Sequence, residues 1–280
     1  MTIFGIDISS YQAGLDLAQV KAEGFDFVFV KVTEGSGYVN PTWPGFRDAA
    51  NANGLVLVGY HYLTTDDVNA QADNFVRNRG PNIPAMIDFE ANGGTLGNFW
   101  AFVNAVNALG VQIALSYIPR WYIQGAGGGG DLSQVPGLIS SSYVSGSGYA
   151  SALYPGDQSS YWDGYDGGTP AILQFTDSAQ VAGQTVDANA FRGNPDQLRA
   201  LLAQPAGAPA PPSAPTQEDT MTPDQDAILR DIQVQLRGPG CAGWPQLGTN
   251  AAGQNLTLVD ALAEALKRIE ALESKAGVQA

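Results

Sequence analysis

The sequence has little of the residue types on which many catalytic and metal-binding sites depend. Its 280 residues include one cysteine, Cys241, and one histidine, His61. A single cysteine excludes an internal disulfide framework, and a single histidine argues against a His-rich metal site and a serine-type triad. The sequence gives no reason to propose a metal or a cofactor. Any catalysis must therefore depend on carboxylates.

Basic residues and long apolar runs are also scarce. Lys and Arg number 13 against 27 Asp and Glu, a formal net charge of −14. Nucleic-acid binding needs clustered basic side chains, so it is excluded as a function. No run approaches the roughly 18 apolar residues of a membrane span, so no membrane insertion is expected. Met1 leads directly into an apolar strand without a signal-type segment, which predicts synthesis in the cytoplasm and export by outside help.

What the chain does contain is an alternation of strand and helix patterns. Strands are expected at 3–8, 25–32, 55–63, 84–90 and 111–117, with helices at 16–23, 40–53, 66–79 and 95–109 between them. This order predicts a parallel sheet, either an open doubly wound sheet or a closed barrel. Two further strands, at 170–176 and 184–187, have no helix between them. They favour an irregular barrel of about five βα units closed by additional strands, with its site at the carboxyl ends of the strands.

The composition divides the chain into three parts. Residues 1–204 form the barrel, 205–220 a Pro/Ala-rich linker, and 221–280 a small helical module. The second helix of the module begins at Thr257, and its apolar residues recur at spacings of 4, 3, 4, 3 and 4, namely Leu258, Leu262, Ala265, Ile269, Leu272 and Ala276. This is a short heptad seam. So small a module should dock on a partner copy, on the barrel or on a wall component.

Acidic residues recur at the ends of the expected strands. Asp88 and Glu90 close the apolar run that starts at Pro84, and they point to the same face because they are two residues apart in a strand. Repulsion and partial burial would keep one of them protonated and the other ionised near neutral pH. Asp7 closes the first strand and Asp187 the last. Singly, each is more typical of a turn or a cap, but in a closed barrel all four converge, which favours a glycosidase-like site.

Aromatic side chains could supply flat surfaces for a sugar. The candidates are Tyr60, Tyr62, Tyr117, Trp121 and Trp162, with core packing as the alternative. Lys31 and Glu34 follow the second strand as a rim ion pair or as substrate contacts. His61 alternates with the two tyrosines beside it and so faces the opposite side, as a structural residue.

Three segments carry a resemblance to a known family. The runs 4–12 (FGIDISSYQ), 24–35 (GFDFVFVKVTEG) and 54–62 (GLVLVGYHY) look like glycoside hydrolase family 25, the Chalaropsis-type lysozymes common among phage endolysins. The pair Asp88 and Glu90, and the closing segments 173–176 and 186–187, match in order and spacing. The resemblance covers about residues 1–204, and its closing part adds Gln174 as a substrate-binding candidate.

The resemblance implies an irregular β/α barrel that cleaves the β-1,4 bond between N-acetylmuramic acid and N-acetylglucosamine in peptidoglycan. Glu90 matches the proton donor. Asp88 would stabilise positive charge or orient the acetamido group, while Asp7 and Asp187 would line the cleft and position the others. A substrate-assisted route and direct attack by water both remain open. As an endolysin, the protein would act at the cell wall after holin-type release; the alternative is a wall-binding protein on a disabled hydrolase barrel.

Two segments bear on specificity and assembly. Residues 138–143 (LISSSY) stand where the family usually has a Trp-containing strand, which affects the aglycone side of the cleft. Residues 240–248 (GCAGWPQLG) resemble tails of lysins from phages of actinobacteria. The module would either bind the cell wall through Trp244 and its loop or form a homo-oligomer through the heptad seam, and Cys241 is a small loop or buried residue.

Overall fold

The computed structural model of the protein describes residues 1–203, 223–250 and 253–276. The chain divides into two compact units, residues 1–212 and residues 213–280. The predicted linker at 205–220 lies outside the described residues. Within the described chain, none of the helices combines the length and the apolar character needed to cross a membrane.

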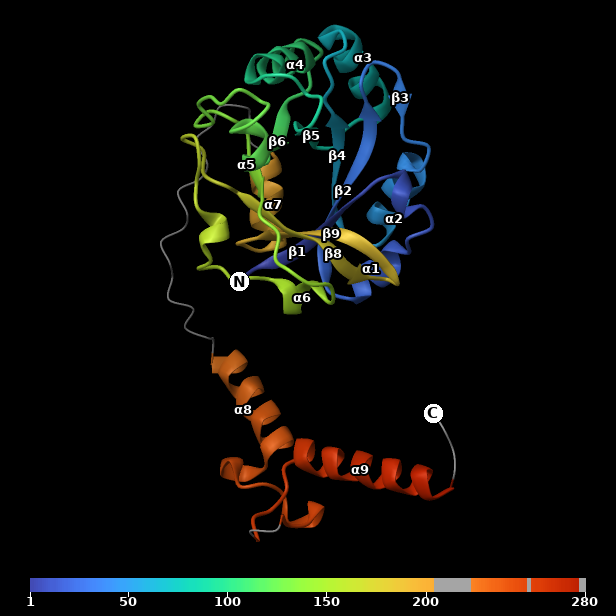
Figure 1. The fold of residues 1–280 in the computed structure, drawn as a ribbon, viewed down its shortest axis with the longest axis vertical. Coiled ribbons are helices and arrows are strands. Elements are labelled where there is room, and N and C mark those ends of the chain that lie inside the picture. Colours follow the sequence, from blue (N-terminus) through green and yellow to red (C-terminus); the bar gives the residue numbers. More distant parts are fainter. Residues whose placement is uncertain (204–222, 251–252, 277–280) are drawn as a thin grey trace. The chain divides into compact units, whose positions relative to one another are not determined.

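The first unit is a closed barrel (Figure 1). Its eight strands, counted over the described residues, are β1 (Ile3–Ile8), β2 (Phe25–Glu34), β4 (Val56–Tyr62), β5 (Ala85–Asp88), β6 (Ile113–Tyr117), β7 (Leu138–Ser141), β8 (Ile172–Val181) and β9 (Gln184–Phe191). They follow the order β1-β9-β8-β7-β6-β5-β4-β2, and the parallel pairing of β1 with β2 closes the ring. β9 runs antiparallel to both of its neighbours. The prediction of an irregular β/α barrel is confirmed.

Five helices follow five of the parallel strands. They are α1 (Leu17–Ala22), α2 (Trp43–Ala52), α3 (Val68–Arg79), α4 (Leu96–Ala108) and α5 (Arg120–Ile123). A short strand, β3 (Tyr38–Val39), pairs with the end of β2. The helix starts follow local chemistry: Asp16 and Asp67 accept backbone N–H groups at the caps of α1 and α3, which satisfies donors that a helix end leaves free.

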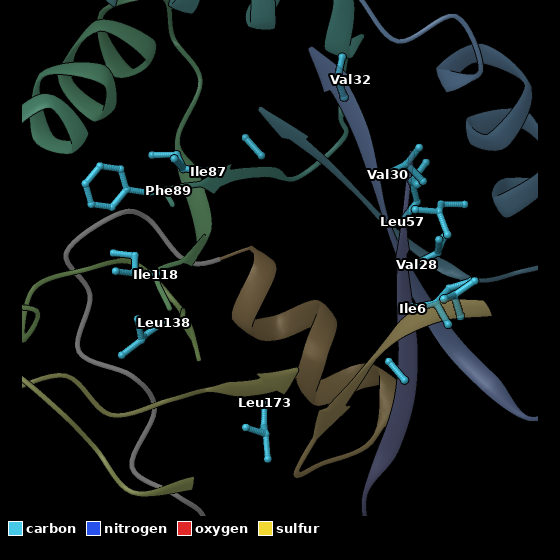
Figure 2. Packing of buried hydrophobic residues seen from close by; sticks show 14 of the residues in the cluster. Ile6, Val28, Val30, Val32, Leu57, Ile87, Phe89, Ile118, Leu138 and Leu173 are labelled. Atoms are coloured by element: carbon cyan, nitrogen blue, oxygen red, sulfur yellow. The ribbon is translucent and has the colours of Figure 1, made fainter. Parts of the chain in front are cut away.

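Alternation along each strand separates two layers of packing. Val28, Val30 and Val32 of β2 belong to the cluster between the sheet and the helices, whose members Figure 2 shows around the strands. Phe27 and Phe29 belong instead to the cluster inside the barrel. Gly5 makes that interior possible, because a Cβ there would lie 2.1 Å from the ring of Phe27.

One helix that the sequence analysis did not predict closes the amino-terminal end of the barrel. Leu198, Leu201 and Leu202 of α7 (Pro195–Leu202) are buried in the interior cluster, with residues from the start of several strands. Asn194 and Gln197 form a capping box at its start. Because α7 fills this end, an opening into the barrel is left at the carboxyl ends of the parallel strands.

Several predicted boundaries were wrong. β5 ends at Asp88, so Glu90 lies in the loop beyond the strand rather than in it. The two closing strands are longer than predicted, and β8 and β9 form a hairpin around Ala182 and Gly183. The segment between β6 and β8, for which the sequence analysis gave no helix or strand bounds, contains α5, β7 and the short helix α6 (Ala150–Leu153).

The second unit contains α8 (Pro223–Arg237) and α9 (Leu258–Ala276), which contact each other. Between them lie two 3-10 turns, η3 (Pro239–Cys241) and η4 (Pro245–Leu247). The heptad residues Leu258, Leu262, Ile269 and Leu272 are all exposed. Cys241 is an exposed residue of the loop.

Candidate active site

A cavity of about 520 Å³ lies at the carboxyl ends of the parallel strands. Its lining includes Asp7, Ser9, Tyr11, Gln12, Phe29, Lys31, Glu34, Tyr60, Tyr62, Met86, Asp88, Glu90, Tyr117, Ile139, Tyr143, Gln174, Asp187 and Asn189. All four acids named from the sequence are in this lining. The apolar residues of the set come from the barrel interior and form the floor.

Asp7 and Asp187 lie directly opposite each other. They are register partners in the antiparallel pairing of β1 with β9, and their carboxyls are hydrogen-bonded to each other. Two ionised carboxylates cannot form such a bond, so the pair holds a proton. Burial is the main cause that raises the pKa of both groups, and with the neighbouring charge of Asp7 it raises that of Asp187 to about 9.

Asp88 and Glu90 form the second acidic pair. Burial is again the first cause that raises both pKa values; the charge of Glu90 adds to the effect on Asp88, and that of Asp7 to the effect on Glu90. The oxygen Oδ1 of Asp88 is buried and has no hydrogen-bond partner. Glu90 is less deeply buried. The pair thus combines a deep, unsatisfied carboxyl with one closer to the opening.

The loop that presents Glu90 is anchored on both sides. The Phe89 side chain is fully buried outside the barrel against the rings of Phe99 and Tyr122. The Phe89 amide donates to the carbonyl of Tyr117 at 2.9 Å. On the cavity side, the Tyr62 hydroxyl donates to the carbonyl of Ala91 at 2.6 Å. These contacts fix the backbone on either side of Glu90.

Lys31 is the cation among the lining residues named above. Its Nζ lies 2.8 Å from Oε2 of Glu34, so the predicted ion pair is confirmed. The same Nζ lies 4.5 Å from the centroid of the Tyr62 ring. The positive charge lowers the pKa of Asp88 and of Glu90, opposing the effect of burial.

A hydrogen-bond network fixes the orientation of Asp7. Gln174 Nε2 and Asn189 Nδ2 both donate to Oδ2 of Asp7, at 2.9 and 2.7 Å. The hydroxyls of Tyr117 and Tyr143 both donate to Oε1 of Gln174, at 3.0 and 2.6 Å. The two tyrosines therefore determine which end of the Gln174 amide faces Asp7.

His61 has the structural role that its position predicted. It is fully buried outside the barrel, stacked on the ring of Phe102 with centroids 4.6 Å apart. Its ring nitrogens lie 2.8 Å from Oγ1 of Thr33 and 3.1 Å from Oε1 of Gln71. Burial lowers its pKa to about 4, so the ring is neutral at neutral pH.

Two aromatic candidates lie outside the lining. Trp121 is 58% exposed on α5 and is not a cavity residue. Trp162 is buried, donates to the hydroxyl of Tyr154 and lies 4.2 Å below the guanidinium of Arg192. Trp162 thus has the alternative role of core packing, and Trp121 stays a predicted sugar contact outside the cavity, whereas Tyr60, Tyr62 and Tyr117 all reach the cavity.

The sequence analysis missed several polar or aromatic lining residues, among them Tyr11, Gln12, Asn189 and Tyr143. Tyr11, 90% exposed, and Gln12 lie in η1 (Ser10–Gln12), directly after the strand that carries Asp7. Asn189 follows Asp187 by two residues in β9 and so shares its face. Tyr143 lies two residues after β7. The i, i+2 rule that paired Asp88 with Glu90 could have found Asn189.

Over the part of the chain that the structure describes, no group of three or more His, Cys, Asp or Glu side chains is arranged to hold a metal ion. The side chains themselves offer proton donors, negative charge and aromatic surface.

Comparisons with known proteins agree with this arrangement. Residues 6–184 match the family model for glycosyl hydrolases family 25, and residues 221–273 match that for the Rv3766 C-terminal domain. An N,O-diacetylmuramidase from Chalaropsis sp is 35% identical over 103 residues, which cover 33% of this chain and 49% of that protein. The uncharacterized protein Rv3766 of Mycobacterium tuberculosis is 29% identical over 204 residues, 65% of this chain and 64% of that protein. The aligned part thus spans about half to two thirds of these relatives.

Solved structures share the barrel. The family 25 lysozyme from Aspergillus fumigatus superposes with a TM-score of 0.58 at 25% sequence identity, covering 73% of this chain and 100% of that one. The muramidase from Trichobolus zukalii gives a TM-score of 0.57 at 26% identity, covering 71% of this chain and 98% of that one. The match to the family model extends over more than half of the sequence, and the chain belongs to glycosyl hydrolase family 25.

Proposed function

We propose that the protein is a peptidoglycan hydrolase of the N-acetylmuramidase type, cleaving the β-1,4 bond between N-acetylmuramic acid and N-acetylglucosamine. One observation carries the proposal: four carboxyls, from β1, β9, β5 and the loop that follows β5, meet in one open cavity. Glycoside hydrolysis passes through a transition state with positive charge on the sugar ring, which such a cavity stabilises. The relatives named N,O-diacetylmuramidase and muramidase support the choice of substrate.

Glu90 is the proposed proton donor. It is the less buried member of its pair, and burial together with the charge of Asp7 raises its pKa, which favours the protonated form that a general acid needs. As the bond between C1 and the glycosidic oxygen breaks, the oxygen takes the bonding electrons and the proton of Glu90. Asp88 lies deeper, and its unpartnered Oδ1 is free to accept the acetamido N–H or to face the positive charge.

Two routes complete the reaction. In one, the acetamido oxygen attacks C1 and water then opens the cyclic intermediate; in the other, water attacks C1 directly. The first retains the anomeric configuration and the second inverts it. The anomer formed first, observed by proton NMR during digestion, distinguishes the two routes.

The proposed activity is tested by the ends that digestion creates. Purified peptidoglycan is digested, reduced with borohydride and analysed by mass spectrometry. A muramidase creates reduced muramic acid ends. Reduced glucosamine ends or cleaved stem peptides would assign another enzyme, and wall binding without new ends would support the alternative of a disabled barrel.

We also propose that the protein acts as a phage endolysin in host lysis. It would be made in the cytoplasm and reach the wall after holin-type release. The resemblance of residues 240–248 to phage lysin tails supports this role. Expressed in an actinobacterial host, the chain should cause lysis only when a pore-forming protein permeabilises the membrane; lysis without permeabilisation would contradict the proposed release route.

For the helical module we propose self-association through α9. Six large apolar side chains of this helix are between 46% and 64% exposed, namely Leu258, Val259, Leu262, Leu266, Ile269 and Leu272. They leave on the order of 600 Å² uncovered, close to the roughly 800 Å² that each partner buries in a stable interface. The heptad spacing fits a second copy of the same helix. α9 has no aromatic residue for sugar stacking.

Sedimentation velocity of the full chain at rising concentration tests this assembly. Leu262→Glu places a charge in the apolar face, whereas Lys267→Glu places the same residue on the opposite face. The wild type and Lys267→Glu should form dimers, and Leu262→Glu should remain monomeric. A monomeric wild type, or equal dimerisation of both variants, would exclude the heptad face; sedimentation with purified walls would then favour the wall-binding alternative.

A further inference from the structure

The two carboxyls of the Asp7–Asp187 pair receive different numbers of hydrogen bonds from side-chain amides. Two side-chain amides donate to Asp7, both to the same oxygen, Oδ2. Among the described residues, no side-chain amide donates to Asp187. An N–H group stabilises a carboxylate that is ionised more than one that is protonated. The amides therefore favour the state in which Asp7 carries the charge and Asp187 carries the shared proton.

Both donors are held in place. Asn189 and Gln174 are register partners in the pairing of β9 with β8, and they are 1% and 5% exposed. Rotating the Gln174 amide would turn its oxygen towards Asp7 and break the hydrogen bonds from Tyr117 and Tyr143. The donors are thus fixed before substrate arrives.

The charge on Asp7 also acts on the proposed acid. After burial, the charge of Asp7 is the largest cause that raises the pKa of Glu90, while Lys31 lowers it. Other titratable groups near these carboxyls come from the surrounding elements: Glu34 on β2, Tyr60 and Tyr62 on β4, Asp88 on β5, Tyr117 on β6, Tyr143 after β7, Asp177 on β8 and Asp187 on β9. Asp7 is the member of this set with two amide donors on one oxygen.

We propose that Asn189 and Gln174 are positioning residues that hold Asp7 as the anion of the Asp7–Asp187 pair, and that this fixed charge keeps Glu90 protonated until it meets the glycosidic oxygen. The inference rests on the proposed function of the cavity. It assigns two uncharged residues a role in setting the pH range of the reaction. Asp187 donates its proton to Asp7 and leaves its other oxygen as a neutral acceptor for substrate.

The test replaces each amide with an apolar side chain of similar shape, in Asn189→Leu and Gln174→Met. Without its donor Asp7 takes up a proton more readily, so Glu90 loses its proton at lower pH. The alkaline limb of the pH profile of kcat/KM, which reports the acid in the free enzyme, should move to lower pH by about 0.5 to 1 unit in each variant. Ser140→Ala, which removes a buried hydroxyl without a partner on β7, is the control and should leave the limb in place.

A purely structural role for the amides would lower activity at every pH without moving the limb, and that result would overturn the inference while leaving the hydrolase function intact. A second measurement does not depend on activity. In a carbon-detected NMR titration of the aspartate carboxyls, the wild type should show Asp7 losing its proton at lower pH than Asp187. In Asn189→Leu, Asp7 should become protonated at higher pH than in the wild type. The same titration curve for Asp7 in both proteins would refute the proposal even if no muramic acid ends are released.

Discussion

Asp187 is predicted to keep a proton in the folded protein at pH values where the unfolded chain has lost it. Its pKa is raised from 3.8 to about 9, first by burial and then by the neighbouring charge of Asp7. Between about pH 5 and 8 the folded state therefore binds one more proton at this site than the unfolded state. Such a proton makes the free energy of unfolding fall as pH rises, by about 1.4 kcal/mol per pH unit. Across this range the site alone accounts for up to about 4 kcal/mol.

Asp187→Asn removes this proton and keeps the shape of the side chain. The free energy of unfolding, measured by urea denaturation at several pH values across the range, should decline less steeply in the variant by up to about 1.4 kcal/mol per pH unit. The pKa values of Asp7, Asp88 and Glu90 are also raised, so these groups add to the decline of the free energy of unfolding with rising pH in the wild type. Asp196→Asn, which removes a carboxylate that is 93% exposed on α7, serves as the control and should keep the wild-type slope. If the free energy of unfolding fell with pH at the same slope in the wild type and in Asp187→Asn, the assignment of the proton to Asp187 would be refuted.

Three further predictions concern the charge of the cavity and the packing around it. Lys31→Met removes the charge that lowers the pKa of Asp88 and Glu90, so both limbs of the pH profile of kcat/KM should move to higher pH by about 0.5 to 1 unit; a shift to lower pH would contradict this. His61→Leu should reduce the free energy of unfolding at pH 7 by about 2 to 4 kcal/mol, because two buried hydrogen-bond partners lose their contact. The wild type should also lose stability between about pH 6.5 and 4, where only the unfolded histidine gains a proton, and an equal loss in the variant would exclude His61 as its source. Gly5→Ala should cost more than about 2 kcal/mol by urea denaturation, because its Cβ would lie 2.1 Å from the Phe27 ring; an unchanged midpoint would show that the ring can move.

The barrel was predictable because its signals are local. Apolar runs bounded by caps and glycines predicted the first five barrel strands and the four helices between them, and the residues at the ends of the predicted strands included all four acids. Because successive side chains of a strand point to opposite faces, the sequence of β4 predicted Tyr60 and Tyr62 on the inside of the barrel and His61 on the outside. Each of these inferences needs only the two-residue repeat of a strand and the order of the elements.

What could not be predicted depends on contacts between distant segments. Tyr143 belongs to the site because β7 pairs with β8 and brings its hydroxyl to Gln174. Trp121 was named for its residue type, and the structure places it as an exposed residue of α5 outside the cavity lining. α7 carried readable signals, an Asn-Pro start and three leucines, but its role as the floor of the barrel follows only from closure of the sheet.

The most direct measurement compares the wild type with Glu90→Gln on purified peptidoglycan, counting reduced muramic acid ends by mass spectrometry. Glu90→Gln keeps the shape of the side chain but has no acidic proton, so the rate of end formation should fall by about 10²- to 10⁴-fold while binding to walls is retained. Glu23→Gln, a change in an exposed residue outside the cavity, should release ends at the wild-type rate. Muramic acid ends formed by Glu90→Gln at the wild-type rate would contradict the role of Glu90 as the proton donor.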